Sequence, residues 1–226
     1  MANPRDKLNY KGDKMNPKEL VSSTSHFFGA FLSAIALILF IQKAESIGMG
    51  NIYMVSVIIF GISLIALYSC SGTYHLSKAM GHMATSLRKL DHAMIYVLIA
   101  GSYMPICFLN LPLKEAVKIT AIIWTIAIIG IIAKLFWITA PNWVSASIYI
   151  LMGWAMVVDF GEFWAANQQG MIFIALGGIT YTVGGIIYAV KKPCFSKYFG
   201  FHEFFHIFVL LGSFFHFYGI YFYMIS

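Results

Sequence analysis

The sequence predicts an all-α fold, a polytopic membrane protein built as a seven-transmembrane-helix bundle. Hydrophobic residues make up 60% of the 226 residues and charged residues only 11%, whereas a soluble domain carries about 25% charged residues. The apolar runs are long and uninterrupted, which is typical of membrane-crossing helices rather than of the short alternating strands of a barrel. Because lipid offers the backbone no hydrogen-bond partners, the chain must satisfy them within its own helices.

Seven apolar runs can be delimited along the chain. They lie at residues 21–42, 51–75, 91–110, 118–138, 142–160, 170–190 and 202–224. The fourth and fifth are separated only by the segment TAPN, where Pro141 cannot continue a helix, so we expect a tight hairpin there. No internal repeat or long linker divides the chain, and we therefore expect a polar N-terminal arm at residues 1–20 and one membrane domain at residues 21–226.

The distribution of lysine and arginine predicts the orientation of the bundle. Of the 15 basic residues, Lys43, Lys114 and Lys118 fall on one side. The other twelve fall on the side of the N-terminal arm: Arg5, Lys7, Lys11, Lys14, Lys18, Lys78, Arg88, Lys89, Lys134, Lys191, Lys192 and Lys197. The arm lacks the apolar centre of a signal peptide. We expect a multi-pass protein of the plasma membrane with a cytoplasmic N-terminus and an external C-terminus.

The distribution of charge argues against a nucleic-acid-binding protein, and the spacing of the cysteines argues against a disulfide-stabilised fold or a cysteine metal site. The net charge of +6 is spread over short loops, and no clustered basic face is present that would bind nucleic acid. Cys70, Cys107 and Cys194 show neither disulfide-type nor metal-type spacing.

Ionisable residues from four predicted spans converge on one layer at the cytoplasmic side. Such residues are costly inside a membrane, so each one is a functional hypothesis. They are Glu19 and His26 from the first span, His75 from the second, Asp91 and His92 from the third, and His202 and His206 from the seventh. The sequence leaves open whether Glu19 and His26 have a function or act as a capping acid and a packing histidine.

The spacing of the histidines favours a metal site. His202 and His206 are four residues apart and therefore lie on one face of a helix, and Ser71 and His75 repeat this spacing. Three imidazoles with a fourth position open to water form a catalytic zinc site. We therefore expect His75, His202 and His206 to bind Zn²⁺. Asp91 is the candidate base for a water molecule at that site.

Single histidines at the membrane interface are more often hydrogen-bonded anchors than metal ligands. This interpretation is preferred for His82, His92 and His216. His216 follows His206 by ten residues, which is about 15 Å along a helix, so it is too far away to bind the same ion.

Three segments give the chain a resemblance to the hemolysin III family, the bacterial branch of the progestin and adipoQ receptor superfamily. They are ELVSSTSH, SGTYH continuing through LRKLDHAMIYVLIAGSYMP, and KKPCFSKYFGFHEFFHIFVLLGSFFHF. Ser22 and Ser25 depart from the Asn and Thr that are usual in the first segment. The resemblance implies seven helices, an internal N-terminus, and a zinc ion held by His75, His202 and His206. Asp91 matches the family's acid near the zinc and Ser71 its neighbouring serine, so both are candidate catalytic residues.

The expected function is a zinc-dependent hydrolase that cleaves an amide or ester bond of a membrane lipid. One alternative is a receptor or sensor of membrane state in which zinc only fastens two helices together. A cytolytic protein is a further alternative, although seven hydrophobic spans are typical of a resident membrane protein. A proton-linked transporter is the last, but the polar residues stop at one depth. The sequence does not predict the oligomeric state.

Overall fold

The computed structural model describes residues 15–82, 85–196 and 198–225. The described chain is helical, without a strand. Its elements are α1 (Pro17–Ser46), α2 (Asn51–Ala79), α3 (Thr85–Phe108), α4 (Leu113–Phe136), α5 (Asn142–Gly153), η2 (Ala155–Asp159), α6 (Phe160–Ala166), α7 (Gln168–Val190), α8 (Phe201–Gly219) and η3 (Ile220–Met224). They form 7 segments long and apolar enough to cross a membrane, which confirms the predicted fold class.

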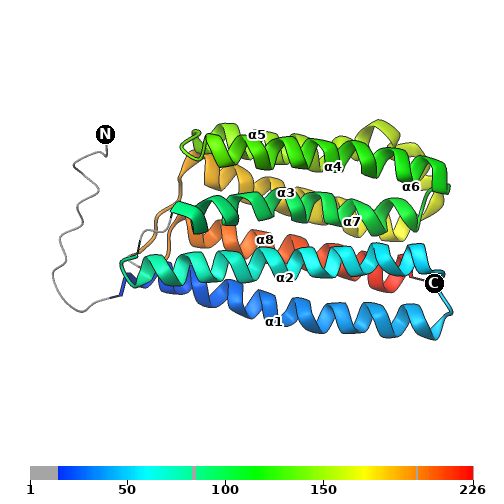
Figure 1. Cartoon of the computed structure of the whole chain (residues 1–226), viewed down its shortest axis with the longest axis horizontal. Helices are drawn as coiled ribbons and strands as arrows, with labels where there is room; N and C mark the ends of the chain where they lie inside the picture. The colour runs from blue at the N-terminus through cyan, green and yellow to red at the C-terminus, as the bar shows by residue number, and fades with distance from the viewer. Residues whose placement is uncertain (1–14, 83–84, 197, 226) are drawn as a thin grey trace.

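The helices run side by side along the long axis of the molecule (Figure 1). We call the end where α1 begins the N-terminal end of the bundle, and the end where α8 finishes the opposite end. α1 packs against α2 and α8, α3 joins α2 to α4, and α7 joins α8 to α5. The assignment of the N-terminal end to the cytoplasm stays a prediction.

The N-terminal arm is only partly covered by the structure, because residues 1–14 lie outside the described residues. Arg5, Lys7, Lys11, Lys14 and Lys197, which contributed to the predicted orientation, lie outside them as well. α1 begins at Pro17, within the range expected for the arm. The Asn16 side chain accepts a hydrogen bond of 3.1 Å from Lys18 N, and proline suits the first position of a helix.

Several helices extend beyond the apolar runs that predicted them. α2 continues to Ala79 rather than ending at 75, and α3 begins at Thr85 rather than at 91. Hydropathy marks only the part of a helix that matches the hydrocarbon layer, whereas backbone hydrogen bonding continues through polar turns. His75 and Asp91 therefore lie within regular helix, one to two turns from its end.

The fifth span is interrupted, which the sequence analysis did not anticipate. The helix stops at Gly153 and η2 follows before α6 begins. The Tyr103 hydroxyl from α3 lies 3.1 Å from Met152 O and 2.9 Å from Gly153 O, and it accepts a 3.0 Å hydrogen bond from Met156 N. A side chain from a neighbouring helix thus satisfies backbone groups at the break, as a membrane interior requires.

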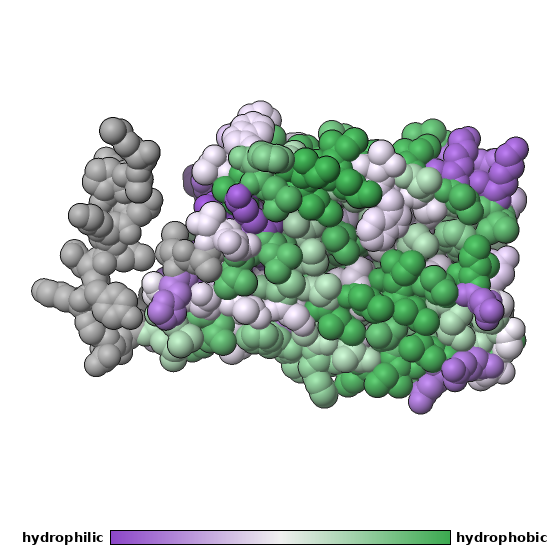
Figure 2. Space-filling model, in the orientation of Figure 1, coloured by the Kyte–Doolittle hydropathy of each residue, from purple (hydrophilic) through white to green (hydrophobic). Residues whose placement is uncertain are grey.

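The outer surface is apolar over most of the height of the bundle. On the face shown in Figure 2, hydrophobic residues cover the middle and hydrophilic residues gather toward the two ends. Large apolar side chains such as Leu151, which is 73% exposed, point outward. This surface is consistent with contact to lipid acyl chains and with the predicted plasma-membrane location.

Candidate metal centre

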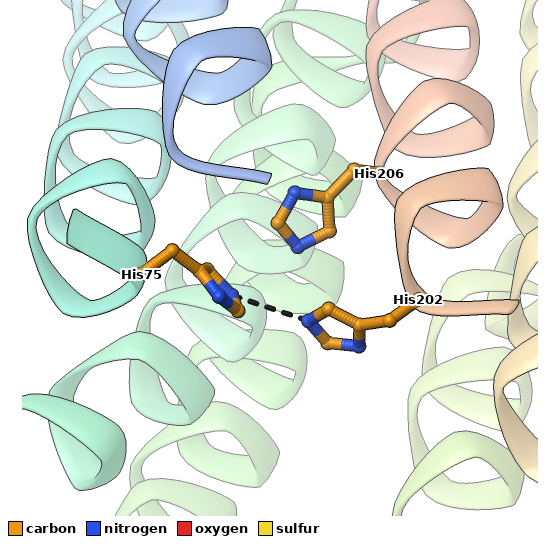
Figure 3. Close-up of side chains that lie close together, drawn as sticks. All are labelled: His75, His202 and His206. Atoms are coloured by element: carbon orange, nitrogen blue, oxygen red, sulfur yellow. Dashed lines mark hydrogen bonds between the residues drawn. The ribbon is translucent and has the colours of Figure 1, made fainter. Parts of the chain in front are cut away.

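Three histidines meet at the N-terminal end of the bundle. His75 comes from the last turns of α2, and His202 and His206 come from the first turns of α8. One ligand nitrogen from each ring lies within 4.8 Å of the others, and the three rings face a common point (Figure 3). His75 and His206 are buried and His202 is half-buried. This group could hold a metal ion.

Glu203 holds the beginning of α8 in place and so positions the two histidines on either side of it. Its carboxylate accepts a 2.7 Å hydrogen bond from the Gly200 backbone N–H and a 3.0 Å hydrogen bond from the Ser22 hydroxyl. The first contact caps the helix and the second ties it to α1. An acid near a helix N-terminus is also favoured by the helix dipole.

Two of the ring nitrogens that point away from the common point, those of His75 and His206, have hydrogen-bond partners. His75 Nδ1 lies 2.6 Å from Glu19 Oε2, and the other oxygen of Glu19 pairs with Lys78. His206 Nδ1 lies 3.3 Å from the backbone carbonyl oxygen of Ser22. A carboxylate and a carbonyl can only accept, so each Nδ1 carries a proton, and the neutral form of each ring then has its lone pair on Nε2. Outer partners of this kind orient metal-binding histidines.

The donor set fits a tetrahedral ion such as zinc. His75 Nε2 and His202 Nε2 face each other at 3.1 Å. Two nitrogens at 2.0–2.1 Å from one tetrahedral zinc are separated by about 3.3 Å. A lone pair of His75 pointing at a second imidazole nitrogen requires a proton or a cation between them. Imidazole also binds iron, copper and nickel, so the same donor set is compatible with these ions.

A cavity extends from His202 and His206 along the inside of the bundle. Its volume is about 140 Å³, and its wall contains His202, His206, Ser71 and Asp91 at the N-terminal end and Met171 toward the opposite end. Most of the other lining residues are apolar and come from α3, α5, α7 and α8. The cavity therefore connects a polar, metal-type site with a long apolar channel.

The two candidate catalytic residues both line this cavity. Asp91 is buried on α3, and the Ser71 side chain of α2 is within hydrogen-bonding reach of it. His92 Nδ1 lies 3.8 Å from Asp91 Oδ2. The structure thus brings Ser71 and Asp91 into the same chamber as His202 and His206, although their catalytic roles stay a prediction.

Two residues whose roles the sequence left open belong to the surroundings of the cluster. Glu19 orients His75, as described above, and His26 stacks on His206 with ring centroids 3.6 Å apart. Both nitrogens of the buried His26 have no hydrogen-bond partner among the described residues, and the ring lines the cavity. The position of Glu19 and His26 in the same predicted layer as His75 was the signal available in the sequence.

The remaining histidines lie outside the cluster. His216 Nε2 donates to the carbonyl oxygen of Ile174 at 3.2 Å. Its ring packs so closely on α7 that a Cβ at Gly177 would lie 2.2 Å from it. His82 is exposed after the end of α2. His82 and His216 therefore do not belong to the group of His75, His202 and His206.

The fold and the site define a class of protein: a seven-helix membrane protein with a buried three-histidine group at one end of an apolar cavity. Comparison with known proteins then gives the family. The Haemolysin-III related family model matches residues 15–217, and the chain belongs to this family. It is a multi-pass plasma membrane protein.

Three relatives illustrate the range of similarity. The Hemolysin-3 homolog of Bacillus subtilis (strain 168) is 37% identical over 87% of this chain and 89% of its own length. The Hemolysin-3 of Bacillus cereus is 34% identical over 92% of each chain. The Adiponectin receptor protein of Drosophila melanogaster is 24% identical over 80% of this chain and 43% of its own length. The last match supports the resemblance to the wider receptor superfamily.

Proposed function

We propose that the protein is a zinc-dependent hydrolase that cleaves an amide or ester bond of a membrane lipid near the cytoplasmic leaflet. One observation carries the proposal: His202 and His206 of the three-histidine group border one cavity together with Ser71 and Asp91, and the remaining wall is mostly apolar. Ligand sites commonly combine an apolar wall with a few convergent polar groups. A lipid fits this division, because its acyl chain is apolar and its amide or ester group is polar.

The long axis of the cavity suits an acyl chain. Leu98 and Ile106 of α3, Met156 of η2 and Val209 of α8 border it between the histidines and the opposite end. A chain lying along these residues would place its polar group next to the metal-type site. The burial of the chain would then supply binding energy, and the histidines and Asp91 would act on the carbonyl group.

The residues around the histidines can carry out the proton transfers of hydrolysis. When bound, zinc would polarise the carbonyl group and make a water molecule more acidic. Asp91 accepts a proton from the water whose oxygen forms the new C–O bond. It returns that proton to the leaving nitrogen or oxygen as the C–N or C–O bond breaks. Ser71 lies beside Asp91 and holds its carboxyl group in position.

The experiment measures bound metal and lipid hydrolysis in detergent-purified protein for the wild type, His202→Ala and Asp91→Ala. We expect the wild type to hold about one zinc per chain. His202→Ala should lose both zinc and activity. Asp91→Ala should keep the zinc and lose at least about a hundredfold in turnover, because general base catalysis contributes 10²–10⁴-fold. A folded wild type that binds no zinc when it is supplied would rule out the metal-dependent mechanism.

A sensor with a structural zinc is the second candidate. It is favoured by the origin of the ligands, because His75 lies on α2 and His202 and His206 lie on α8, with α1 packed against both helices. A metal would fasten these two helices directly. In that case Asp91→Ala would leave function unchanged, whereas His202→Ala would lower the melting temperature and abolish the response to membrane composition.

A further inference from the structure

A second site lies on the other side of the bundle, where α4 and α5 meet at their hairpin. Lys134, in the last turn of α4, is only 5% exposed. Its ammonium group donates to the hydroxyl of Ser145, which is buried on α5. None of the ion pairs among the described residues involves Lys134. The structure thus buries a positive charge and gives it a single neutral partner.

One neutral hydroxyl group does not replace the hydration that the ammonium group of Lys134 loses on burial. An ammonium ion has three N–H donors, and a buried charge is normally paired with an opposite charge. Arg88, near the beginning of α3, lies close enough for its positive charge to act on Lys134. No ion pair between Arg88 and an acid occurs in the described residues. Arg88 also acts on the carboxyl group of Asp91, but Lys134 itself has no acidic partner among the described ion pairs, so its surroundings favour an anion.

Lys134 and Ser145 border a small pocket that such an anion could enter. The pocket has a volume of about 40 Å³ and is bordered by Tyr96, Trp137, Val144 and Ile148. Tyr96 packs directly against Gly130, one turn before Lys134, where an added Cβ would lie 2.3 Å from the tyrosine ring. This close packing of α3 on α4 forms the floor of the pocket beside the ammonium group.

The position of the pocket identifies the source of the anion. It lies where α4 ends and α5 begins, which is at one end of the membrane-crossing segments. Trp137 is 55% exposed, and Phe136 and Trp143 beside it are more exposed still. Exposed tryptophans at the end of a membrane helix typically lie at the level of the lipid headgroups. Basic pockets between membrane helices at this level bind anionic lipid headgroups.

We propose that this pocket binds the phosphate group of an anionic phospholipid. Lys134 and Ser145 donate hydrogen bonds to the phosphate oxygens, Arg88 adds a favourable field, and Trp137 flanks the headgroup. The acyl chains of the lipid then lie against the apolar outer face of α4 and α5. This site is separate from the histidine group and does not depend on the proposed hydrolase function.

The test compares lipid binding by native mass spectrometry of the full chain in detergent. Phosphatidylglycerol and phosphatidylcholine with identical acyl chains are added to the wild type, Lys134→Met and Lys192→Met. Lys192 is the matched control, because it is exposed at the same end of the bundle. We expect phosphatidylglycerol to bind the wild type more tightly than phosphatidylcholine. Lys134→Met should weaken phosphatidylglycerol about tenfold, as expected for a charge-assisted hydrogen bond. Lys192→Met should change it less than about twofold, as expected for an exposed charge.

Further variants and probes decide among the outcomes. Lys134→Arg should retain the preference for phosphatidylglycerol, and Ser145→Ala should reduce it several-fold. An unchanged melting temperature in Lys134→Met would show that the fold is intact, and Ser145→Ala supplies the result if Lys134→Met does not fold. The proposal would be overturned if the wild type bound both lipids equally well. It would also be overturned if Lys134→Met bound phosphatidylglycerol as tightly as the wild type does. Displacement of phosphatidylglycerol by an equal concentration of inorganic phosphate would overturn the lipid as the source of the anion.

Discussion

Two buried polar clusters lie along the same pair of helices, α2 and α8. They differ in whether all of their polar groups have hydrogen-bond partners within the protein. The first is the group of His75, His202 and His206 at the N-terminal end. The second lies deeper in the bundle and consists of Tyr68, Ser213 and Tyr181, the last of which comes from α7. Both clusters are built from side chains that are costly to bury without partners.

In the second cluster, which we call the hydroxyl cluster, the side chains pair with one another and with one backbone carbonyl group. Tyr68 donates to the carbonyl oxygen of Val209 at 3.3 Å, so its oxygen accepts from Ser213 at 2.6 Å. Ser213 in turn accepts from Tyr181 at 2.8 Å. Each hydroxyl hydrogen has an acceptor within the protein. This arrangement requires no ligand and serves to lock α2, α7 and α8 together.

In the histidine cluster, by contrast, the pairing of the ring nitrogens leaves room for a ligand. Glu19 and the Ser22 carbonyl oxygen contact the outer nitrogens of His75 and His206, and the inner nitrogens of His75 and His202 face each other. The comparison teaches that burial alone does not mark a functional site, since both clusters are buried. The distinguishing feature is the set of hydrogen-bond partners: the hydroxyl cluster is fully paired within the chain, whereas the facing histidine nitrogens could hold a metal ion.

The largest expected effect is the loss of metal on removing a ligand of the histidine cluster. His206→Ala removes one of three nitrogens, so bound zinc should fall from about one per chain to near zero, measured by metal analysis of purified protein. The matched control is His216→Ala, which removes a buried histidine ten residues further along the same helix. His216→Ala should keep its zinc even though it loses the bond to Ile174. Equal metal loss in both variants, with the fold intact, would contradict the assignment of the site.

A smaller effect is expected for the residue that orients a ligand. Glu19→Gln keeps the shape of the side chain but removes the charge that holds His75 Nδ1–H and Lys78. Loss of such an outer partner typically weakens metal binding 10–100-fold, and we expect the zinc dissociation constant to rise by about that factor. Competition with a chelator of known affinity measures it. Glu45→Gln, at an exposed position near the end of the same helix, should leave the constant unchanged.

These expectations show how far sequence reasoning reached. The histidine spacing on α8 and the common layer of His75 predicted the cluster correctly, because helix geometry and membrane depth are both readable from one sequence. The partners of Glu19 and His26 were not readable, since they depend on how α1 is rotated against α2 and α8. Rotation about a helix axis is determined by tertiary packing, which leaves little trace in a uniformly apolar helix.

The interruption of the fifth span shows the same limit. Hydropathy from 142 to 160 is continuous, so the sequence predicted one uninterrupted span. The α-helix ends at Gly153, where the hydroxyl group of Tyr103, about 50 residues earlier, is a hydrogen-bond partner for backbone groups at the break. A break supported by a distant side chain has no local signal. Lys134 entered the sequence analysis only as one of the basic residues that predict the orientation, and its burial without an ion pair among the described residues depends on the packing of α4 and α5.

The smallest expected effect is at the centre of the hydroxyl cluster. Ser213→Ala removes the group that bridges Tyr68 and Tyr181, and Tyr181 loses its acceptor inside the bundle. An unsatisfied buried polar group costs about 1–3 kcal/mol, so the melting temperature should fall by several degrees at a scale of about 2–4 °C per kcal/mol. Bound zinc should not change, because no atom of this cluster faces the histidines' common point. The exposed Ser46→Ala is the control for deletion of a hydroxyl, and it should melt within a degree or so of the wild type, as surface changes usually do. If Ser213→Ala instead lost zinc while keeping its melting temperature, the two clusters would be coupled, and the complete network would have to be counted as part of the site.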